Sequence, residues 1–264
     1  MPASGVWATG RTRHYHSTFL HTDPNPAFMR FRLPLLALLA ASVPLLACKS
    51  PDTARQDSRA GDVVADTGRA LDSALIEAAD LGRIQGAAAA PVWLLVISDF
   101  QCPYCRMWHE QTWPAIEREY VQPGRVRVAY INLPLSNHQH ALPAAEAAMC
   151  AGVQGKFWQV ADGIFDTQER WTPLRDASAV YDSIATAAGV DVPRWRECVA
   201  QHRTVPMINA DAARAGAIGV QSTPSFVVMR GQEVVRGIAG AYPIETFREA
   251  LDTALAGAGQ APRR

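Results

Sequence analysis

The stretch DFQCPYCRMW, residues 99–108, carries two cysteines, Cys102 and Cys105, separated by a proline and a tyrosine. The residues that lead into it, PVWLLVISDF, form an apolar run rich in strand-forming side chains, and the residues that follow, RMWHEQTWPAIEREY, have the composition of a helix. A strand that passes into a helix through a C-x-x-C pair is the usual setting of a redox-active dithiol. The stretch therefore predicts both the local fold and a thiol–disulfide chemistry.

The predicted position of Cys102 at the start of a helix should change its acidity. The first backbone N–H groups of a helix have no partner within the helix, and together with the helix dipole they favour negative charge. We therefore expect the pKa of the Cys102 thiol to lie below its ordinary value. Cys105, three residues later on the same helical face, can close a disulfide with it, and Pro103 suits the first turn, where its missing N–H removes no hydrogen bond.

Length and composition limit the possible classes of protein. The chain has 264 residues, 25 basic and 25 acidic side chains, and 48% apolar residues. This is enough for one domain with extensions and a sizeable core, and the balanced charge gives no indication of a nucleic-acid partner. The five cysteines can form two disulfides and leave one over, which calls for an explanation in an exported protein.

The N-terminal segment offers that explanation. Residues 1–28 are polar and lack a helical or strand period, so we interpret them as a non-native or disordered extension that precedes a true start at Met29. Residues 29–47 combine two arginines with an apolar stretch of signal-peptide length, too short to cross a bilayer comfortably. The end of this segment, LLAC, resembles a bacterial lipobox and implies that Cys48 is lipidated. A cleaved signal without lipid and a buried apolar helix are the alternatives.

The remaining chain divides into a linker and one folded domain. Residues 48–79 are rich in small and charged side chains and predict a flexible tether, with one short helix near its end. The folded domain is expected over residues 80–258, followed by a frayed tail at 259–264. Within the domain, residues 91–100 predict a buried central strand, because the run is continuously apolar.

A second main strand and a set of helices are expected after the C-x-x-C helix, which should bend at Pro114. Residues 124–135 alternate in the manner of a strand and end at a proline. The helical stretches that follow form an insertion, with Asn137 and Asp191 as candidate N-caps. Two strands around an RGQ turn and a final helix complete the domain.

This order of elements resembles the DsbA-like branch of the thioredoxin superfamily over residues 82–255. The phrases SDFQCPYC, QGKFW and GVQSTPSFVV carry the resemblance. It implies an α/β, thioredoxin-like fold with a helical insertion between the second main strand and the hairpin. It also implies that Pro224 follows a cis peptide bond and faces the C-x-x-C pair, with Thr223 offering a backbone contact to a substrate strand.

The resemblance implies a thiol–disulfide oxidoreductase on the periplasmic side of the bacterial envelope, in which Cys102 attacks, Cys105 resolves, and no cofactor is bound. Its partners would be client proteins with free thiols or disulfides, and a membrane redox partner that is either quinone-linked or a thiol donor. Tyr104 stands where DsbA itself has histidine. Pro103-Tyr104 and Thr223 resemble a DsbG-type isomerase or reductase instead, although the segment before residue 80 is too short and polar for the dimerisation domain of that type.

The resemblance also implies a structural disulfide between Cys150 and Cys198 in the helical insertion, with two buried free thiols as the alternative. Together with a lipidated Cys48 and the C-x-x-C pair, this disulfide accounts for all five cysteines.

Two further residues have open interpretations. His109 is expected to be a partly exposed helix residue, but it could join Cys102 and Cys105 as a metal ligand in a non-catalytic, metal- or partner-binding lipoprotein. No second C-x-x-C or H-x-x-x-H supplies the remaining ligands of such a site. Asp99 is either a proton acceptor for the buried thiol or a capping or solvated acid.

Overall fold

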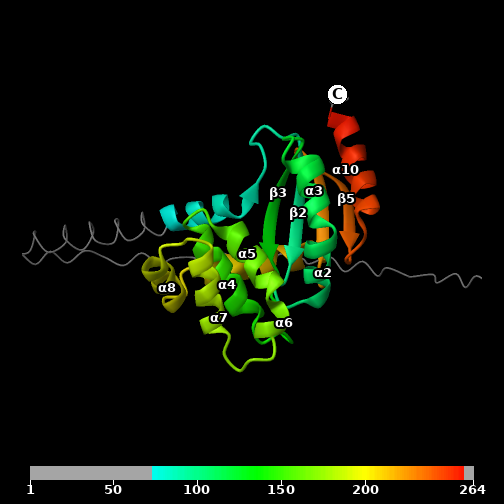
Figure 1. Ribbon diagram of the computed structural model, residues 1–264. Coiled ribbons are helices and arrows are strands. Elements are labelled where there is room, and N and C mark those ends of the chain that lie inside the picture. The colour runs from blue at the N-terminus through cyan, green and yellow to red at the C-terminus, as the bar shows by residue number, and fades with distance from the viewer. Residues whose placement is uncertain (1–72, 259–264) are drawn as a thin grey trace, which may run out of the picture. The chain divides into compact units, whose positions relative to one another are not determined.

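The computed structural model describes residues 73–258 (Figure 1). The predictions made for residues 1–28, for the signal segment 29–47, for lipidation of Cys48 and for the tail 259–264 lie outside the described residues. Between residues 73 and 258, no helix combines the length and the apolar character needed to cross a membrane.

A five-stranded sheet with the order β1-β3-β2-β4-β5 forms the centre of the domain. Its strands are β1 (Ile84–Gln85), β2 (Val92–Ser98), β3 (Val126–Asn132), β4 (Ser225–Arg230) and β5 (Glu233–Ala239). β2 and β3 are parallel, and the other neighbouring pairs are antiparallel. The sequence of β2 is almost uninterruptedly apolar because this strand lies between two others and has residues buried on both faces.

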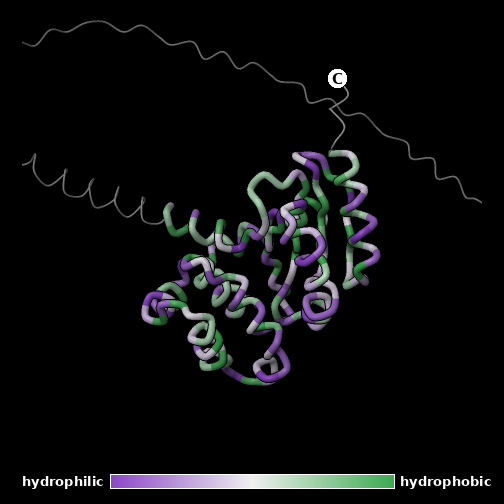
Figure 2. The backbone as a smooth tube through the Cα atoms, turned by 45° about the horizontal axis from the view of Figure 1, so that its top comes forward, coloured by the Kyte–Doolittle hydropathy of each residue, from purple (hydrophilic) through white to green (hydrophobic). Residues whose placement is uncertain are grey.

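The helix that carries the C-x-x-C pair packs on one face of this sheet with α10. The pieces are α2 (Pro103–Gln111), α3 (Trp113–Ile116), a π-helical turn over Glu117–Val121, and α10 (Ile244–Ala258). The predicted bend is confirmed, and the break falls at Thr112, just before Pro114, because a proline cannot continue the helical hydrogen bonding. Figure 2 shows hydrophobic and hydrophilic residues alternating along α10, whose apolar side packs on β2 and β4.

Six helices form the insertion between β3 and β4 (Figure 1). They are α4 (Ala141–Gly152), α5 (Phe157–Asp166), α6 (Gln168–Trp171), α7 (Ser178–Ala187), α8 (Val192–Ala200) and α9 (Val205–Ala217). The predicted α/β fold with an inserted helical region is confirmed. Asp191 caps α8 by accepting from the Arg194 N–H at 3.2 Å, as expected. The Asn137 cap is wrong, because the N-cap residue of α4 is His140.

A disulfide joins the insertion internally. Cys150 in α4 and Cys198 in α8 are bonded, with their Cα atoms 5.8 Å apart. Both cysteines are buried, so the bond links the cores of two helices that are separated by 48 residues in sequence.

The short helix predicted near the end of the 48–79 tether is confirmed, and it continues to residue 82. Residues 73–82 are helical, and Ala79 has no exposed surface. Gly82 approaches α4 so closely that an added Cβ would lie 2.2 Å from the carbonyl oxygen of Gly152. Close packing against α4 is therefore confined to the end of this helix, at Ala79 and Gly82, while most of residues 73–78 are exposed.

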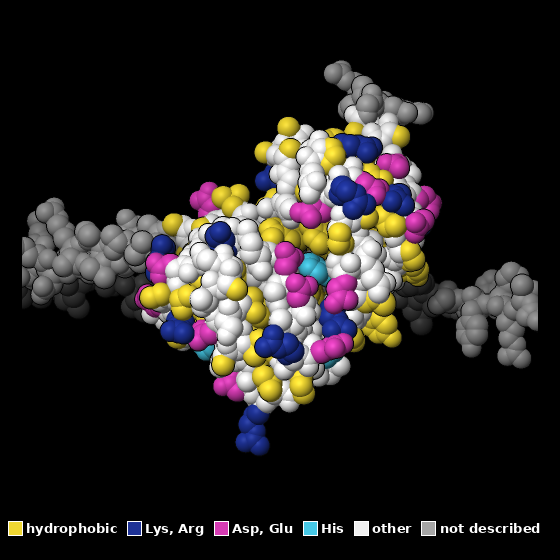
Figure 3. Space-filling view, in the orientation of Figure 1, with side chains coloured by type: hydrophobic (Ala, Val, Ile, Leu, Met, Phe, Trp, Pro, Cys, Tyr) yellow, Lys and Arg dark blue, Asp and Glu magenta, His cyan; other side chains and the backbone are white. Residues whose placement is uncertain are grey.

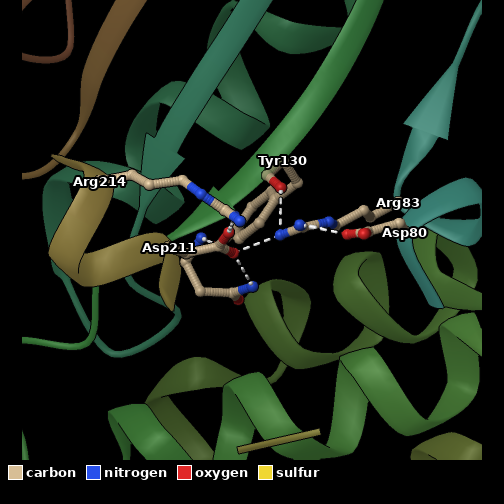
Figure 4. Close-up of polar contacts among 6 residues, drawn as sticks. Asp80, Arg83, Tyr130, Asp211 and Arg214 are labelled. Atoms are coloured by element: carbon tan, nitrogen blue, oxygen red, sulfur yellow. Dashed lines mark hydrogen bonds and ion pairs between the residues drawn. The ribbon is translucent and has the colours of Figure 1, made fainter. Parts of the chain in front are cut away.

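A buried ion-pair cluster attaches this N-terminal helix to the rest of the domain (Figure 4). Arg83 lies between Asp80 and the fully buried Asp211 of α9, and it also donates to the carbonyl oxygen of Tyr130 in β3 at 3.2 Å. Asn132 donates to Asp211 from both its backbone and its side-chain nitrogen, at 3.1 and 3.0 Å. Buried charges need such partners, so the cluster holds residues 80–83, β3 and α9 in one arrangement.

Candidate active site

The C-x-x-C pair lies where β2 ends and α2 begins. Cys102 is the N-cap residue of α2, with an extended backbone (φ −69°, ψ 122°), and Pro103 occupies the first turn. Cys102 and Cys105 are both free thiols, with 4% and 1% of their surface exposed. The short loop after β2 therefore presents one sulfur at the helix start and keeps the second beneath it.

The two thiols have opposite acidities. The pKa of Cys102 is lowered to about 6, first by a hydrogen bond from the Cys105 side chain, then by the Thr223 side chain and the backbone N–H groups of Cys105 and Tyr104. Burial acts in the opposite direction. Burial raises the pKa of Cys105 well above its ordinary value, and the neighbouring Cys102 raises it further. The pKa of Cys102 is lowered, as expected, but the N–H groups at the helix start lower it less than the hydrogen bond from Cys105 does.

The loop before β4 lies against Cys102. The Thr223–Pro224 peptide bond is cis, and the Cys102 thiol donates to the carbonyl oxygen of Thr223 at 3.5 Å, across 121 residues of sequence. Tyr104 is 62% exposed beside this contact. The fold thus brings Cys102, Cys105, Thr223 and Pro224 to one place, as the resemblance implied.

Asp99 holds the loop that leads into the motif. Its buried carboxylate accepts from the backbone N–H of Gln101 at 2.7 Å and of Leu135 at 2.9 Å. It also pairs with His138 Nδ1 at 2.7 Å. Of the two interpretations of Asp99, the structure supports a capping role, because both carboxylate oxygens are engaged by the loop and its neighbours.

Two contacts from the insertion complete the support of this loop, and sequence reasoning missed both. Gln168 of α6 is buried and donates to the carbonyl oxygens of Phe100 at 2.7 Å and Cys102 at 3.1 Å. The backbone N–H of His140 donates to Gln101 Oε1 at 2.6 Å. A lone glutamine or histidine in a helical stretch carries no signal in the sequence, so only the tertiary contact identifies these residues.

His109 takes no part in the dithiol site. It is 9% exposed, so the expectation of a partly exposed residue is wrong. Its Nε2 lies 3.1 Å from Asp162 Oδ1 in α5, and its ring stacks on Phe165 at 4.6 Å. Across the described part of the chain, no group of three or more His, Cys, Asp or Glu side chains is placed to bind a metal.

Acidic and basic side chains intermix over the face of the molecule that Figure 3 shows.

Comparison with known proteins identifies the family. The model of the family described as thioredoxin matches residues 79–253, which is most of the chain. The chain therefore belongs to the thioredoxin family, and its fold is that of the DsbA-like thiol–disulfide oxidoreductases. The fold is similar to that of alpha-DsbA1 from Wolbachia pipientis, with a TM-score of 0.60 and 19% identity over 67% of this chain and 92% of that one. BdbD from Bacillus subtilis is similar at a TM-score of 0.59 and 18% identity, over 66% and 93%.

Relatives by sequence carry two kinds of name. The chain is 28% identical over 142 residues to a probable disulfide bond formation protein D of Bacillus anthracis, covering 53% of this chain and 65% of that protein. It is 34% identical over 185 residues to a protein named Na(+)/H(+) antiporter NhaA 1 of Salinispora arenicola, covering 70% of this chain but 26% of that protein. The chain thus spans about a quarter of the length of the antiporter-named relatives.

Proposed function

We propose that this protein is a thiol–disulfide oxidoreductase of the bacterial envelope that exchanges a Cys102–Cys105 disulfide with client protein thiols. The observation that carries the proposal is the pair of adjacent thiols with opposite acidities, in which the pKa of Cys102 is about 6 and that of Cys105 is raised well above its ordinary value. Thiolates are the nucleophiles of disulfide exchange, so this difference assigns attack to Cys102 and resolution to Cys105.

The oxidising reaction balances without a cofactor. A client thiolate attacks Cys102 Sγ, the Cys102–Cys105 bond breaks, and Cys105 leaves as a thiolate that then takes up one proton. A second client thiolate attacks the client sulfur of the mixed disulfide, and Cys102 leaves as a thiolate. Two electrons pass from the client to the protein, which is left as a dithiol. Reduction or isomerisation of a client follows the same steps in reverse, beginning with the Cys102 thiolate.

The other residues of the site shape the cleft in which the client binds. Pro103 and the exposed Tyr104 occupy the turn beside the attacking sulfur. Pro224 has no N–H, and the Thr223 carbonyl oxygen lies 3.5 Å from Cys102 Sγ. In the proposal, this carbonyl group receives the backbone of an extended client segment while its cysteine reacts.

The direction of exchange is set by the reduction potential, which depends on the stability of the Cys102 thiolate. A pKa of about 6 lies between the values of about 7 for thioredoxin and about 3.5 for DsbA. We therefore expect a potential between about −270 mV and about −120 mV, the values of those two proteins. Equilibration with glutathione measures it. A value near the upper limit would favour an oxidant served by a quinone-linked membrane partner, and one near the lower limit would favour a reductase or isomerase served by a thiol donor.

Trapping experiments test the roles of the two cysteines. The Cys105→Ala variant should accumulate mixed disulfides with client proteins, because the client sulfur can no longer be displaced from Cys102. The Cys102→Ala variant should neither trap clients nor catalyse exchange. A protein that exchanges no disulfide through either cysteine and instead purifies with tightly held metal would overturn the proposal in favour of a binding role.

The proposal places the domain on the periplasmic side of a membrane, held there by lipid on Cys48. Cys48→Ser should abolish lipid attachment and detergent partitioning while exchange activity is retained. A mature soluble N-terminus located after residue 48 in the unmodified protein would contradict the lipid anchor and leave the redox assignment in place.

A further inference from the structure

Four residues, 99–102, connect the end of β2 to the start of α2 and determine where the Cys102 sulfur lies. The Cys102 N–H donates to the carbonyl oxygen of Asp99 at 3.1 Å and closes a turn within this connection. The carbonyl oxygens of Phe100 and Cys102 need partners elsewhere, since both residues are buried and a buried backbone oxygen without a hydrogen bond is costly. The position of the attacking sulfur therefore depends on which groups supply those hydrogen bonds.

One buried side chain of the insertion donates to both oxygens. Gln168 Nε2, in α6, lies 2.7 Å from the carbonyl oxygen of Phe100 and 3.1 Å from that of Cys102. The amide nitrogen has two hydrogens, so both bonds form at once. Only 5% of Gln168 is exposed, and water therefore does not compete freely for either oxygen.

The Cys102 carbonyl group is also where the hydrogen bonding of α2 begins. Its oxygen accepts from the N–H groups of Cys105 at 3.1 Å and Arg106 at 3.2 Å, and Cys102 is the N-cap residue of the helix. Gln168 thus holds the peptide group that joins Cys102 to the helix, and so fixes the rotation about the Cα–C bond of Cys102. Because the sulfur is attached through the same Cα atom, a change in that rotation would move it relative to the Thr223 carbonyl oxygen, which lies 3.5 Å from it.

The helix that carries Gln168 is itself anchored on both sides. Trp171, at the other end of α6, has no exposed surface, and its Nε1 donates to the carbonyl oxygen of Ile164 at 2.8 Å. On the outer side, Glu169 pairs with Arg106 of α2 at 2.7 Å, so α6 lies beside the start of α2 (Figure 1). An exposed ion pair contributes little by itself, so the buried Trp171 is the main anchor of the Gln168 amide.

The other contacts between the insertion and the loop end on side chains. Leu135 and His138 engage the Asp99 carboxylate, and the His140 N–H donates to the side-chain oxygen of Gln101. These contacts hold the two residues before the motif. Gln168 differs from them because it engages the backbone of the loop at Cys102 itself.

We propose that Gln168 is a positioning residue of the exchange: its amide holds the carbonyl oxygens of Phe100 and Cys102, and thereby keeps Cys102 Sγ in the place from which it attacks. Gln168 gives and takes no proton or electron pair, and it acts only through the backbone of Cys102. Without it, the turn is free to rotate and the sulfur leaves the helix-start N–H groups that favour its thiolate. This inference rests on the proposed function and names a residue that sets the geometry of its attacking sulfur.

The test is the rate at which the reduced protein reacts with dithiodipyridine, a small disulfide. The Cys102 thiolate attacks one of its sulfur atoms and releases one thiopyridone, and Cys105 then displaces the second and leaves the Cys102–Cys105 disulfide. Gln168→Met, which keeps the length of the side chain but donates no hydrogen bond, should slow the first step by about three- to tenfold, the effect of losing one hydrogen bond between neutral groups.

The matched control is Trp195→Phe in α8. It removes another buried hydrogen bond from a side chain to a backbone carbonyl group, since Trp195 Nε1 donates to the Ala147 oxygen at 2.9 Å within the insertion. This variant should lose stability and react at the native rate. If it is slowed as much as Gln168→Met, the effect is a general loss of packing and the inference is overturned.

The pH profile of Gln168→Glu separates positioning from stability. Near pH 8 its carboxylate cannot donate and faces two carbonyl oxygens, so this variant should be slower than Gln168→Met. Near pH 4 the carboxyl group is protonated, because burial raises its pKa above the ordinary value of about 4.3, and it again donates one hydrogen bond. Relative to the native protein at the same pH, Gln168→Glu should therefore recover in acid while Gln168→Met stays slow. The groups around the loop that titrate in both proteins, Cys102, His138 with Asp99, and Glu169, affect the variant and the native protein alike.

Two results would overturn the inference: native reactivity of Gln168→Met, or a slowing of Gln168→Glu that is the same near pH 8 and near pH 4. The comparison of Gln168→Glu with the native protein decides the question by itself if Gln168→Met does not fold. If the native protein reacts with dithiodipyridine without forming the Cys102–Cys105 disulfide, the proposed function fails instead.

Discussion

Replacing Cys105 by alanine should raise the pKa of Cys102, because the hydrogen bond from the Cys105 side chain is the largest cause that lowers it. In the intact dithiol the pKa of Cys102 is about 6, against an ordinary value of 9.0. A hydrogen bond to a charged group contributes about 1.5–3 kcal/mol, and about 1.4 kcal/mol corresponds to one pKa unit. The variant should therefore have a Cys102 pKa between about 7 and about 8.

The change is large enough to read directly at neutral pH. With a pKa of about 6, about nine tenths of Cys102 is thiolate at pH 7, and the variant should have between about a tenth and a half. The rate of alkylation of Cys102 by iodoacetamide as a function of pH, followed by mass spectrometry, gives the pKa in each protein. Cys105→Ser is the matched control, because its hydroxyl can still donate and should keep most of the depression.

A Cys102 pKa that stays at about 6 in Cys105→Ala would refute this reasoning and assign the depression to the Thr223 side chain and the backbone N–H groups at the start of α2. The stability of the reduced protein provides an independent check. Because the folded pKa is depressed, the Cys102 thiolate stabilises the reduced fold at alkaline pH, and this contribution is lost as the pH falls from 9.0 toward about 6. The oxidised protein has no such titration and should lack this pH dependence.

Four other substitutions test the packing that supports the site, each by chemical denaturation. Cys150→Ala should lower stability by about 4 kcal/mol, the chain-entropy value for a loop of this length, and leave the exchange rate unchanged. Gly82→Ala should cost about 3 kcal/mol, because its Cβ would meet a backbone carbonyl oxygen at 2.2 Å. Gly216→Ala, in a helix with open space around it, should instead stabilise the protein by about 1 kcal/mol. A Gly82→Ala protein that is also stabilised would show that the Gly82 contact relaxes. Asp211→Asn should cost about 3 kcal/mol by leaving Arg83 without its buried counter-charge, and an unchanged denaturation midpoint would show that Asp80 suffices.

The local elements follow closely from the sequence, because their signals lie within a few residues. The apolar run of β2, the break of the C-x-x-C helix before Pro114 and the Asp191 cap of α8 each depend on neighbouring residues. The boundary at residue 79 falls inside a helix, because composition alone does not show that Ala79 and Gly82 contact α4 while the residues before them stay exposed.

The sequence by itself indicated the class of the fold and the candidate reactive cysteines, since the C-x-x-C motif lies between a strand and a helix and the phrases at residues 154–158 and 219–228 resemble the same family. The tertiary structure decided which groups surround those cysteines. Thr223 and Gln168 lie far from Cys102 in the chain, and their contacts with it arise only where the loop before β4 and the insertion pack against the motif. The depressed pKa of Cys102 illustrates the difference: the motif predicts its direction, but hydrogen bonding and burial act over a few ångströms in space, and only the folded chain sets those distances.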